Sequence, residues 1–188
     1  MIVLGIDPGL ANCGFGVVTR RDGALAALDG GVVTTSASAS PAARLARLQR
    51  EVEALLDEHE PACVAMEALY FGLNVRSAFA VGQARGAVLA AAGARGLDCF
   101  DYTPQQVKGA VCGSGRADKG QVARMVQAVL RLPELPAPDH ASDALAVAIT
   151  HANHAPALTA VLRATDVRAG GPRPSGATRA RAGLGDVA

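Results

Sequence analysis

The chain has 188 residues, half of them hydrophobic, and its formal net charge is only +1. This length supports one domain with a substantial core, and the small net charge does not by itself indicate a nucleic-acid partner. No apolar stretch reaches the roughly 18 residues of a membrane span, and the N-terminus lacks the basic region of a signal peptide, so we expect a cytoplasmic protein without membrane segments.

The first part of the chain is predicted to be rich in strands. Apolar runs indicate strands at residues 2–7, 14–19 and about 25–35. Pro8-Gly9 ends the first of them, and Asp22-Gly23 is a strong hairpin signal between the second and the third. Ser40 then provides an N-cap and Pro41 a proline at the first helical position, so a helix is expected to begin there and to end before Pro61.

The rest of the chain alternates strands and helices. The expected elements are, in order, a strand at 62–66, a helix at about 76–94, a strand at 97–102, a helix opened by Thr103-Pro104, a helix from Asp118 to about Arg131, and a helix at about 140–153. This order predicts an α/β domain with a mixed sheet. We expect the domain to cover residues 1–166 and the Gly-, Pro- and Arg-rich residues 167–188 to form a disordered basic tail.

The four cysteines are spaced too widely for a zinc site and are predicted to be free thiols in a reducing compartment. They are Cys13, Cys63, Cys99 and Cys112.

Two acidic residues end apolar strands. Asp7 closes the first predicted strand and Glu67 closes the fourth. Alone, Asp7 with the following Pro and Gly would be an ordinary turn sequence. Two such residues together favour a shared site, because a buried unpaired charge is costly and a cation would stabilise them. Asp143, on the last predicted helix, is the third candidate.

The last helix offers two possible partners for Asp143. His140 is three residues away and Asp139 is four residues away, so both share its face of the helix. Asp139 follows Pro138 and is predicted to be the N-cap, which makes His140 the favoured ligand while Asp139 stays the alternative. Clustered carboxylates select Mg²⁺ or Mn²⁺, and two such ions roughly 4 Å apart can hydrolyse a phosphodiester.

Residues 105–131 carry five basic side chains and one acidic side chain, which favours contact with phosphates. The basic residues are Lys108, Arg116, Lys119, Arg124 and Arg131. Arg76 and Arg85, on the helix after Glu67, are expected to extend this patch. Tyr70-Phe71 follows Glu67 closely; the pair would stack on bases if exposed and belong to the core if buried.

Several motifs occur in the order found in one family. They are Gly5-Ile6-Asp7-Pro8-Gly9, Ala65-Met66-Glu67, Gly82-Gln83-Ala84-Arg85-Gly86, Thr103-Pro104 with Gln106-Val107-Lys108, and residues 143–151. Together they resemble the bacterial RuvC crossover junction endodeoxyribonucleases over about residues 1–154. The resemblance implies a ribonuclease H-like fold with a five-stranded mixed sheet flanked by helices, and a homodimer. It also implies paired symmetric nicking of four-way Holliday junctions in recombination and repair, two Mg²⁺ per subunit with Mn²⁺ as a substitute, and the branch-migration proteins RuvA and RuvB as partners.

The resemblance also assigns roles by position. It puts the catalytic metal-binding acids on Asp7, Glu67 and Asp143. The aromatic residue that contacts the junction falls on Tyr70, and two DNA-binding lysines fall on Lys108 and Lys119. The Ala- and Gly-rich helix after Arg76 would form the dimer contact.

One position departs from the commoner family pattern. Many members have Asp where this chain has His140. An unperturbed imidazole titrates at about pH 6.5, so we expect activity to fall in mild acid. An unchanged pH–rate profile in a His140→Asp variant would count against this hypothesis.

Two other functions fit the same residues. The first is a junction-binding module without catalysis, which the intact acids disfavour. The second is a ribonuclease H-like enzyme that acts on RNA or on RNA–DNA hybrids. A cleavage assay on a synthetic four-way junction separates the first, and competition between substrates separates the second.

Overall fold

A computed structural model describes residues 1–68 and 75–166, without the side chains of residues 75–77 and 155–166. It contains five strands, β1 (Ile2–Asp7), β2 (Asn12–Arg21), β3 (Ala24–Thr34), β4 (Cys63–Glu67) and β5 (Asp98–Tyr102). The helices of the described residues are α1 (Pro41–His59), α2 (Val75–Ala94), α3 (Pro104–Cys112), α4 (Lys119–Leu130) and α5 (Asp139–Asp166). None of them is both long enough and apolar enough to span a membrane.

The five strands form one mixed sheet in the order β3-β2-β1-β4-β5. β1 pairs antiparallel with β2 and parallel with β4, and β5 is parallel to β4. The prediction of an α/β domain with a five-stranded mixed sheet is therefore confirmed. Because β1, β4 and β5 run in the same direction, their carboxyl ends lie at one edge of the sheet.

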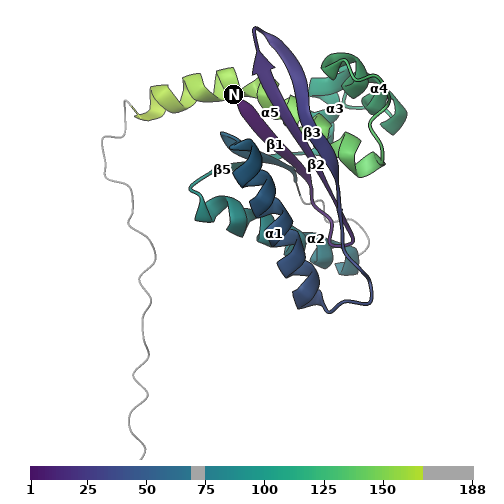
Figure 1. Ribbon diagram of the computed structural model, residues 1–188. Helices are drawn as coiled ribbons and strands as arrows, with labels where there is room; N and C mark the ends of the chain where they lie inside the picture. The colour runs from purple at the N-terminus through teal and green to yellow at the C-terminus, as the bar shows by residue number, and fades with distance from the viewer. Residues whose placement is uncertain (69–74, 167–188) are drawn as a thin grey trace, which may run out of the picture. The chain divides into compact units, whose positions relative to one another are not determined.

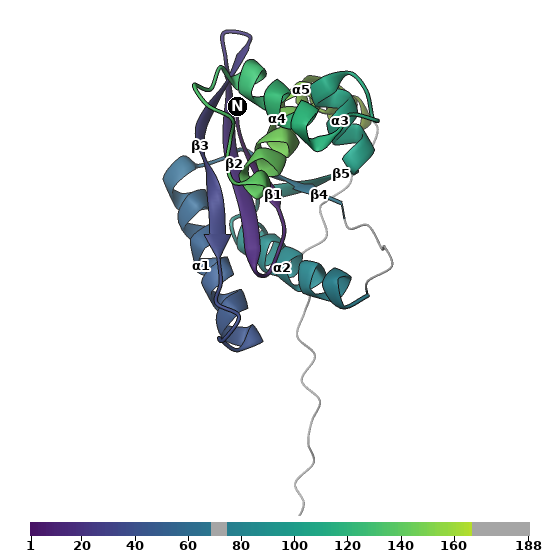
Figure 2. The same cartoon turned by 90° about the vertical axis from the view of Figure 1, so that its right-hand side faces the viewer.

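Helices cover both faces of the sheet (Figure 1). α1 and α2 pack on one face, and α3, α4 and α5 pack on the other, as Figure 2 also shows. Alternate residues of a strand point to opposite faces, and β1 follows this rule, since Leu4 and Ile6 pack with α1 and α2 while Val3 packs on the α5 side. Asp7 is in phase with Val3, and Glu67 is in phase with Ala65 of β4, so both carboxylates belong to the face that α5 covers.

Local capping signals fixed three helix starts. Ser40 accepts a hydrogen bond from the Ala43 backbone N–H, and Pro41 is the first residue of α1, as predicted. Thr103 opens α3 and Asp118 opens α4, each with a complete capping box.

The last helix differs from its prediction at both ends. It begins at Asp139, so that residue lies in the first turn and is not the N-cap. It also continues past Pro156 to Asp166, where the sequence had indicated an end near residue 153. The residues after Pro156 are mostly good helix formers, and these continue the helix.

The contacts divide the chain into two units. The first covers Met1–Pro156, and the second covers Ala157–Ala188. Of the second unit, only the helical residues as far as Asp166 are described. The predicted tail at 167–188 lies outside the described residues, so this tail and the domain limit at residue 166 stay predictions.

The four cysteines are free, as expected.

Glycines let α5 lie directly against the sheet. A Cβ atom on Gly5 of β1 would lie 2.2 Å from the Ala144 carbonyl oxygen. A Cβ atom on Gly14 of β2 would lie 2.0 Å from the His140 carbonyl oxygen. No larger residue fits at either position without moving the helix backbone. This close contact brings the first turns of α5 to the carboxyl end of β1.

Candidate active site

Asp7 and Glu67 lie side by side at the carboxyl ends of two inner strands of the sheet. They end the neighbouring parallel strands β1 and β4, in which Ile6 pairs with Met66. Both are the last residue of their strand and both are partly buried. The two carboxylates are therefore positioned by sheet register, and neither depends on a loop.

α5 adds two further side chains. His140 Nδ1 lies 2.6 Å from Asp7 Oδ2, so an imidazole N–H donates to the carboxylate. Asp143, one turn further along, lines the same cavity as Asp7 and His140. Asp139 is exposed and is not among the lining residues. Of the two candidates for the first turn, His140 is thus the one that the fold places beside Asp7.

One cavity of about 380 Å³ contains all four candidate residues. Its other walls come from α3 and α4 and include two basic side chains, Lys108 and Lys119. The Lys119 ammonium lies 3.3 Å from Asp143 Oδ2 and its side chain is 74% exposed, which leaves it free to turn toward a ligand. Pro104, Val107 and Val122 form the apolar part of the wall. The cavity therefore combines carboxylates, an imidazole and two cations around one space.

Burial and nearby negative charges raise the pKa values of several side chains in this cavity. The pKa of Glu67 is raised to about 7, chiefly by burial and also by the nearby charges of Asp7 and Asp143, while Lys119 and Lys108 act in the opposite direction. Burial also raises the pKa of Asp143, although Lys119 lowers it. The charge of Asp143 in turn raises the pKa of Lys119. Even with the two lysines, the carboxylates hold their protons more tightly than usual, and a bound cation would stabilise their ionised form.

The donor types suit Mg²⁺ or Mn²⁺, since three of the four candidate ligands are carboxylates. Within residues 1–68 and 78–154, however, no three Asp, Glu, His or Cys side chains are arranged to hold one ion. Two of the carboxylates are instead engaged by protein groups, Asp7 by His140 and Asp143 by Lys119. The residues fit a divalent cation in chemistry, and their side chains would have to turn to ligate it.

The sequence profile of the family described as "Crossover junction endodeoxyribonuclease RuvC" matches residues 3–151. The chain belongs to the RuvC family. RuvC of Roseiflexus sp. (strain RS-1) is 50% identical over 155 residues, which are 82% of this chain and 92% of that protein. RuvC of Moorella thermoacetica is 49% identical over 156 residues, 83% of this chain and 93% of that protein.

Solved structures agree with this assignment. The Thermus thermophilus RuvC structure has a TM-score of 0.78 and 41% identity, and the match covers 85% of this chain and 98% of that one. T. thermophilus RuvC in complex with Holliday junction substrate has a TM-score of 0.77 and 39% identity, covering 84% of this chain and 96% of that one. The predicted family and its ribonuclease H-like fold are thereby confirmed.

The candidate DNA-binding residues fall into three groups. Lys108 and Lys119 line the cavity that contains the four clustered residues. Arg116 lines a separate cavity of about 610 Å³ together with Arg124 and Ser114. Tyr70 and the side chain of Arg76 lie outside the described residues. Of the predicted basic residues, Lys108 and Lys119 thus lie beside the carboxylates, and Arg116 lies in a different cavity.

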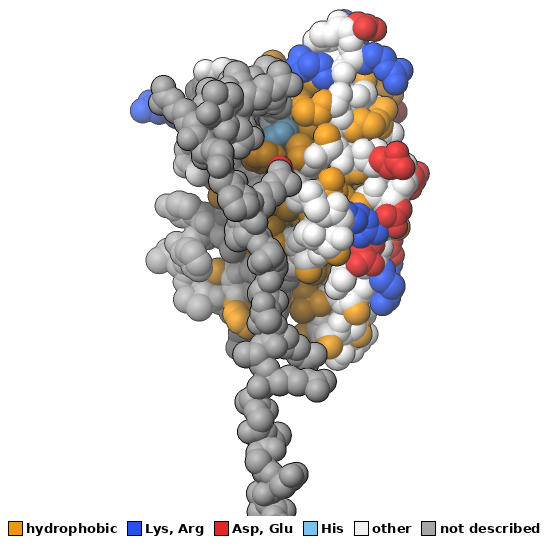
Figure 3. Space-filling view, turned by 90° about the vertical axis from the view of Figure 1, so that its left-hand side faces the viewer, with side chains coloured by type: hydrophobic (Ala, Val, Ile, Leu, Met, Phe, Trp, Pro, Cys, Tyr) orange, Lys and Arg blue, Asp and Glu red, His pale blue; other side chains and the backbone are white. Residues whose placement is uncertain are grey.

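The prediction that Arg85 extends the basic patch is wrong. Its guanidinium pairs with the carboxylate of Asp101, and its side chain is only 13% exposed. The alternation of β5 explains this pairing, because Tyr102 faces α5 and Asp101 therefore faces α2. On the described part of the surface drawn in Figure 3, acidic and basic side chains are interspersed, in keeping with the small net charge.

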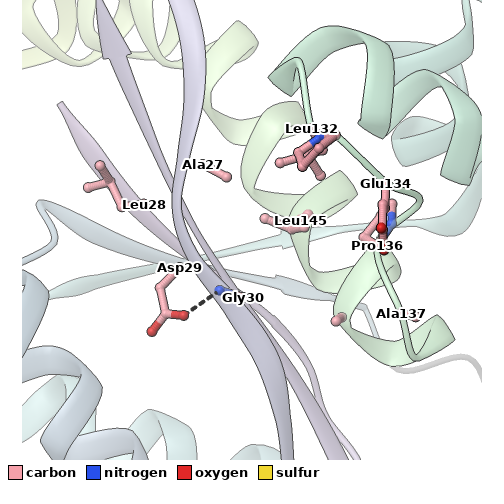
Figure 4. A pocket seen from close by; sticks show the side chains of 11 residues that line it. Ala27, Leu28, Asp29, Gly30, Leu132, Glu134, Pro136, Ala137 and Leu145 are labelled. Carbon is pink, nitrogen blue, oxygen red and sulfur yellow. Dashed lines mark hydrogen bonds between the residues drawn. The ribbon is translucent and has the colours of Figure 1, made fainter.

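A second cavity of nearly equal size, about 390 Å³, lies between β3 and the loop that joins α4 to α5 (Figure 4). Its charged side chains are Asp29 and Glu134. Asp29 already accepts a hydrogen bond from the Gly30 backbone N–H and contacts His59. None of the four clustered candidates lines this cavity, so we assign the chemistry to the first one.

Sequence reasoning missed the contribution of the glycines of β2. Gly14 allows the first turn of α5 to reach Asp7, yet the sequence suggested only that Gly14 belonged to a strand. The signal was present in the run Gly14-Phe15-Gly16, since two glycines in one strand weaken it and indicate that something packs closely there.

Proposed function

We propose that this chain resolves Holliday junctions in recombination and repair, by paired symmetric nicks made through metal-assisted hydrolysis. The observation that carries the proposal is the meeting of Asp7, Glu67, His140 and Asp143 in one cavity beside Lys108 and Lys119. The 39% identity to the T. thermophilus RuvC solved in complex with Holliday junction substrate supports a four-way junction as the substrate.

In this proposal the four clustered residues hold two Mg²⁺ ions per subunit, with Mn²⁺ as a substitute. The ions, when bound, would activate water and stabilise the leaving oxygen. Asp7 and Glu67 offer carboxylates from a rigid sheet edge, while Asp143 and His140 close the site from α5. His140, which now contacts Asp7, would have to leave that carboxylate for Asp7 to bind a cation.

Lys119 has two roles in the proposal. Without DNA or cation, it partly neutralises Asp143. With a cation bound to Asp143, its exposed ammonium would be available to bind the phosphate backbone, together with Lys108 from the other wall. Arg116, outside the cavity, would hold a phosphate further along an arm. Base stacking by Tyr70 and phosphate contact by Arg76 stay predictions.

Two symmetric nicks require two copies of the site, and a two-fold dimer supplies them. α2 offers a surface for this contact, with Phe79 68% exposed and Leu89 39% exposed. Gly86 and Gly93 of the same helix have open space where a Cβ would stand, which permits close approach of a second helix. Chromosomal DNA as substrate would place the enzyme in the cytoplasm, and RuvA and RuvB are the partners that the family implies.

The proposal is tested with synthetic substrates in Mg²⁺ and in Mn²⁺. The wild-type chain should cut a four-way junction at symmetric positions, in preference to duplex DNA and to an RNA–DNA hybrid. Asp7→Asn should keep junction affinity and lose cleavage. Junction binding without nicks in either metal would favour a non-catalytic module, and preferred cutting of the hybrid would favour a different ribonuclease H-like enzyme. Cleavage that survives Asp7→Asn would reject the metal site.

A further inference from the structure

Arg85 of α2 connects the helix to the ends of two strands. One of its guanidinium nitrogens, Nη2, pairs with both carboxylate oxygens of Asp101 on β5. The other, Nη1, donates to the backbone carbonyl of Glu67 at 3.3 Å. The same nitrogen lies 4.0 Å from the sulfur of Met66. Arg85 thus holds the backbone of the last residue of β4 from the α2 side of the sheet.

The carboxylate of Glu67 projects from the opposite side of the sheet. Met66 packs toward α1 and α2, so the next side chain, Glu67, points to the α5 side, where it lines the cavity. The side chain of Arg85 therefore does not enter the cavity. It contacts the backbone carbonyl of Glu67 and the carboxylate of Asp101, but none of the carboxylates that line the cavity. Any influence on the site must pass through the backbone of Glu67.

Charge repulsion in the cavity acts on the end of β4. Glu67 shares its cavity with Asp7 and Asp143, and like charges in a partly buried space repel one another. β4 ends at Glu67, and after it the Ala68 N–H bonds to the Tyr102 carbonyl of β5. Asp101, the anchor of Arg85, lies next to Tyr102, so the guanidinium and this backbone bond tie the same two strand ends together.

We propose that Arg85 is a positioning residue that fixes the backbone of Glu67, and thereby aims its carboxylate at the cation and the scissile phosphate. This inference rests on the proposed function of the cavity. A planar guanidinium suits the task because its fork can hold a carboxylate and still donate to a carbonyl. Groups that orient a metal ligand in this way typically change metal affinity or activity by roughly 10–100-fold when removed.

The chain contains a matched control for a purely structural role. Arg95, the residue that follows the end of α2, also pairs with an Asp carboxylate, through Nε and Nη2 to Asp57 at 2.7–2.8 Å. It also donates to backbone carbonyls, those of Ala91 and Glu53. Asp57 and Glu53 belong to α1, and Arg95 does not line the cavity. Loss of Arg95 therefore removes a comparable ion pair without touching Glu67.

The experiment compares Arg85→Met, Arg85→Lys, Asp101→Asn and Arg95→Met in the full chain. Urea unfolding gives their stability, and calorimetry with Mn²⁺ alone gives cation affinity. Junction binding and the single-turnover cleavage rate at saturating junction are measured separately. We expect Arg85→Met to lower Mn²⁺ affinity and the cleavage rate by roughly 10–100-fold while junction affinity stays unchanged. Added Mn²⁺ should recover part of the rate, and Arg85→Lys should fall between Arg85→Met and the wild type.

Asp101→Asn is the second variant in case Arg85→Met does not fold. It removes the anchor of the guanidinium at a half-exposed position, and it should shift cation affinity in the same direction by a smaller factor. Arg95→Met should lose stability and keep both cation affinity and cleavage rate within about twofold of wild type.

The inference is overturned if Arg85→Met or Asp101→Asn, once folded, binds Mn²⁺ and cuts as the wild type does, or loses no more than Arg95→Met. The proposed function fails separately, when the wild-type chain itself does not cut the junction. Since Mn²⁺ affinity is measured without DNA, the position of Glu67 is tested in either case.

Discussion

The two halves of the candidate site are built in different ways. Asp7 and Glu67 come from strand ends, and their separation follows from the pairing of β1 with β4. His140 and Asp143 come from a helix that reaches the sheet only because the facing strands carry glycines. The strand half is therefore set by backbone hydrogen bonds, whereas the helix half is set by packing. Substitutions far from the carboxylates should break the helix half first.

The largest effect is expected from Gly14→Val. A Cβ at this position would lie 2.0 Å from the His140 carbonyl oxygen, and a backbone atom cannot turn away as a side chain can. The first turn of α5 must move, and we expect a loss of about 3 kcal/mol or more in the free energy of unfolding, together with loss of junction cleavage. Urea unfolding and the cleavage assay measure the two effects.

Gly109→Ala is the control for that substitution. Gly109 lies inside α3, and a Cβ there would meet no atom within 4 Å. We expect it to gain about 0.5–1 kcal/mol from the better helix propensity of Ala. Equal stability of the Gly14 and Gly109 variants would contradict the packing account of the helix half.

A smaller effect, confined to catalysis, should separate the two candidates in the first turn of α5. His140→Ala removes the imidazole that contacts Asp7 and should slow cleavage by roughly 10–100-fold. Asp139→Ala changes an exposed side chain outside the cavity and should leave the rate near that of the wild type. Single-turnover cleavage at saturating Mg²⁺ is the measurement. The reverse pattern would make Asp139 the ligand.

The smallest effect concerns the strand half and the pH dependence of stability without metal. The pKa of Glu67 is raised from 4.5 to about 7, chiefly by burial. The folded state therefore holds this proton more tightly than the unfolded state. The contribution of Glu67 to stability is fully present below pH 4.5 and is lost as the pH rises through about 7. Glu67→Gln should remove this loss, worth about 1–2 kcal/mol at pH 8 after solvent screening is considered.

Urea unfolding at pH 5 and pH 8 in EDTA tests this prediction. Glu58→Gln, at an exposed position of α1, is the matched control and should change the pH dependence little. With added Mn²⁺, the wild type should become more stable than Glu67→Gln at pH 8, because its carboxylate then has a cation to bind. If the stability of Glu67→Gln depends on pH as strongly as that of the wild type, the pKa of Glu67 is not raised by its surroundings.

Local signals in the sequence were sufficient for most of the fold. Ser40 with Pro41, and Thr103 with Pro104, mark helix starts through neighbouring residues, and the structure has both starts where they were predicted. The carboxylates of Asp7 and Glu67 could be placed at strand ends for the same reason. These features depend on neighbours along the chain, so they can be predicted from the sequence alone.

Other features depend on residues far apart and could not be predicted in this way. Arg85 looked like a free cation, because its partner Asp101 becomes a neighbour only when α2 packs on β5. The choice between Asp139 and His140 likewise needed the place of α5 on the sheet. The sequence also predicted that the last helix ends near residue 153, whereas α5 continues past Pro156 to Asp166.

The central claim is that the strand half and the helix half act as one metal-dependent site on junction DNA. It is tested most directly by the single-turnover rate of four-way junction cleavage for the wild type, Glu67→Gln, Asp143→Asn and the double variant. Each single variant should lose nearly all cleavage, and the double variant should lose little more, since residues that act as a unit are not additive. A single variant that cuts at the wild-type rate, or losses that multiply in the double variant, would contradict the account.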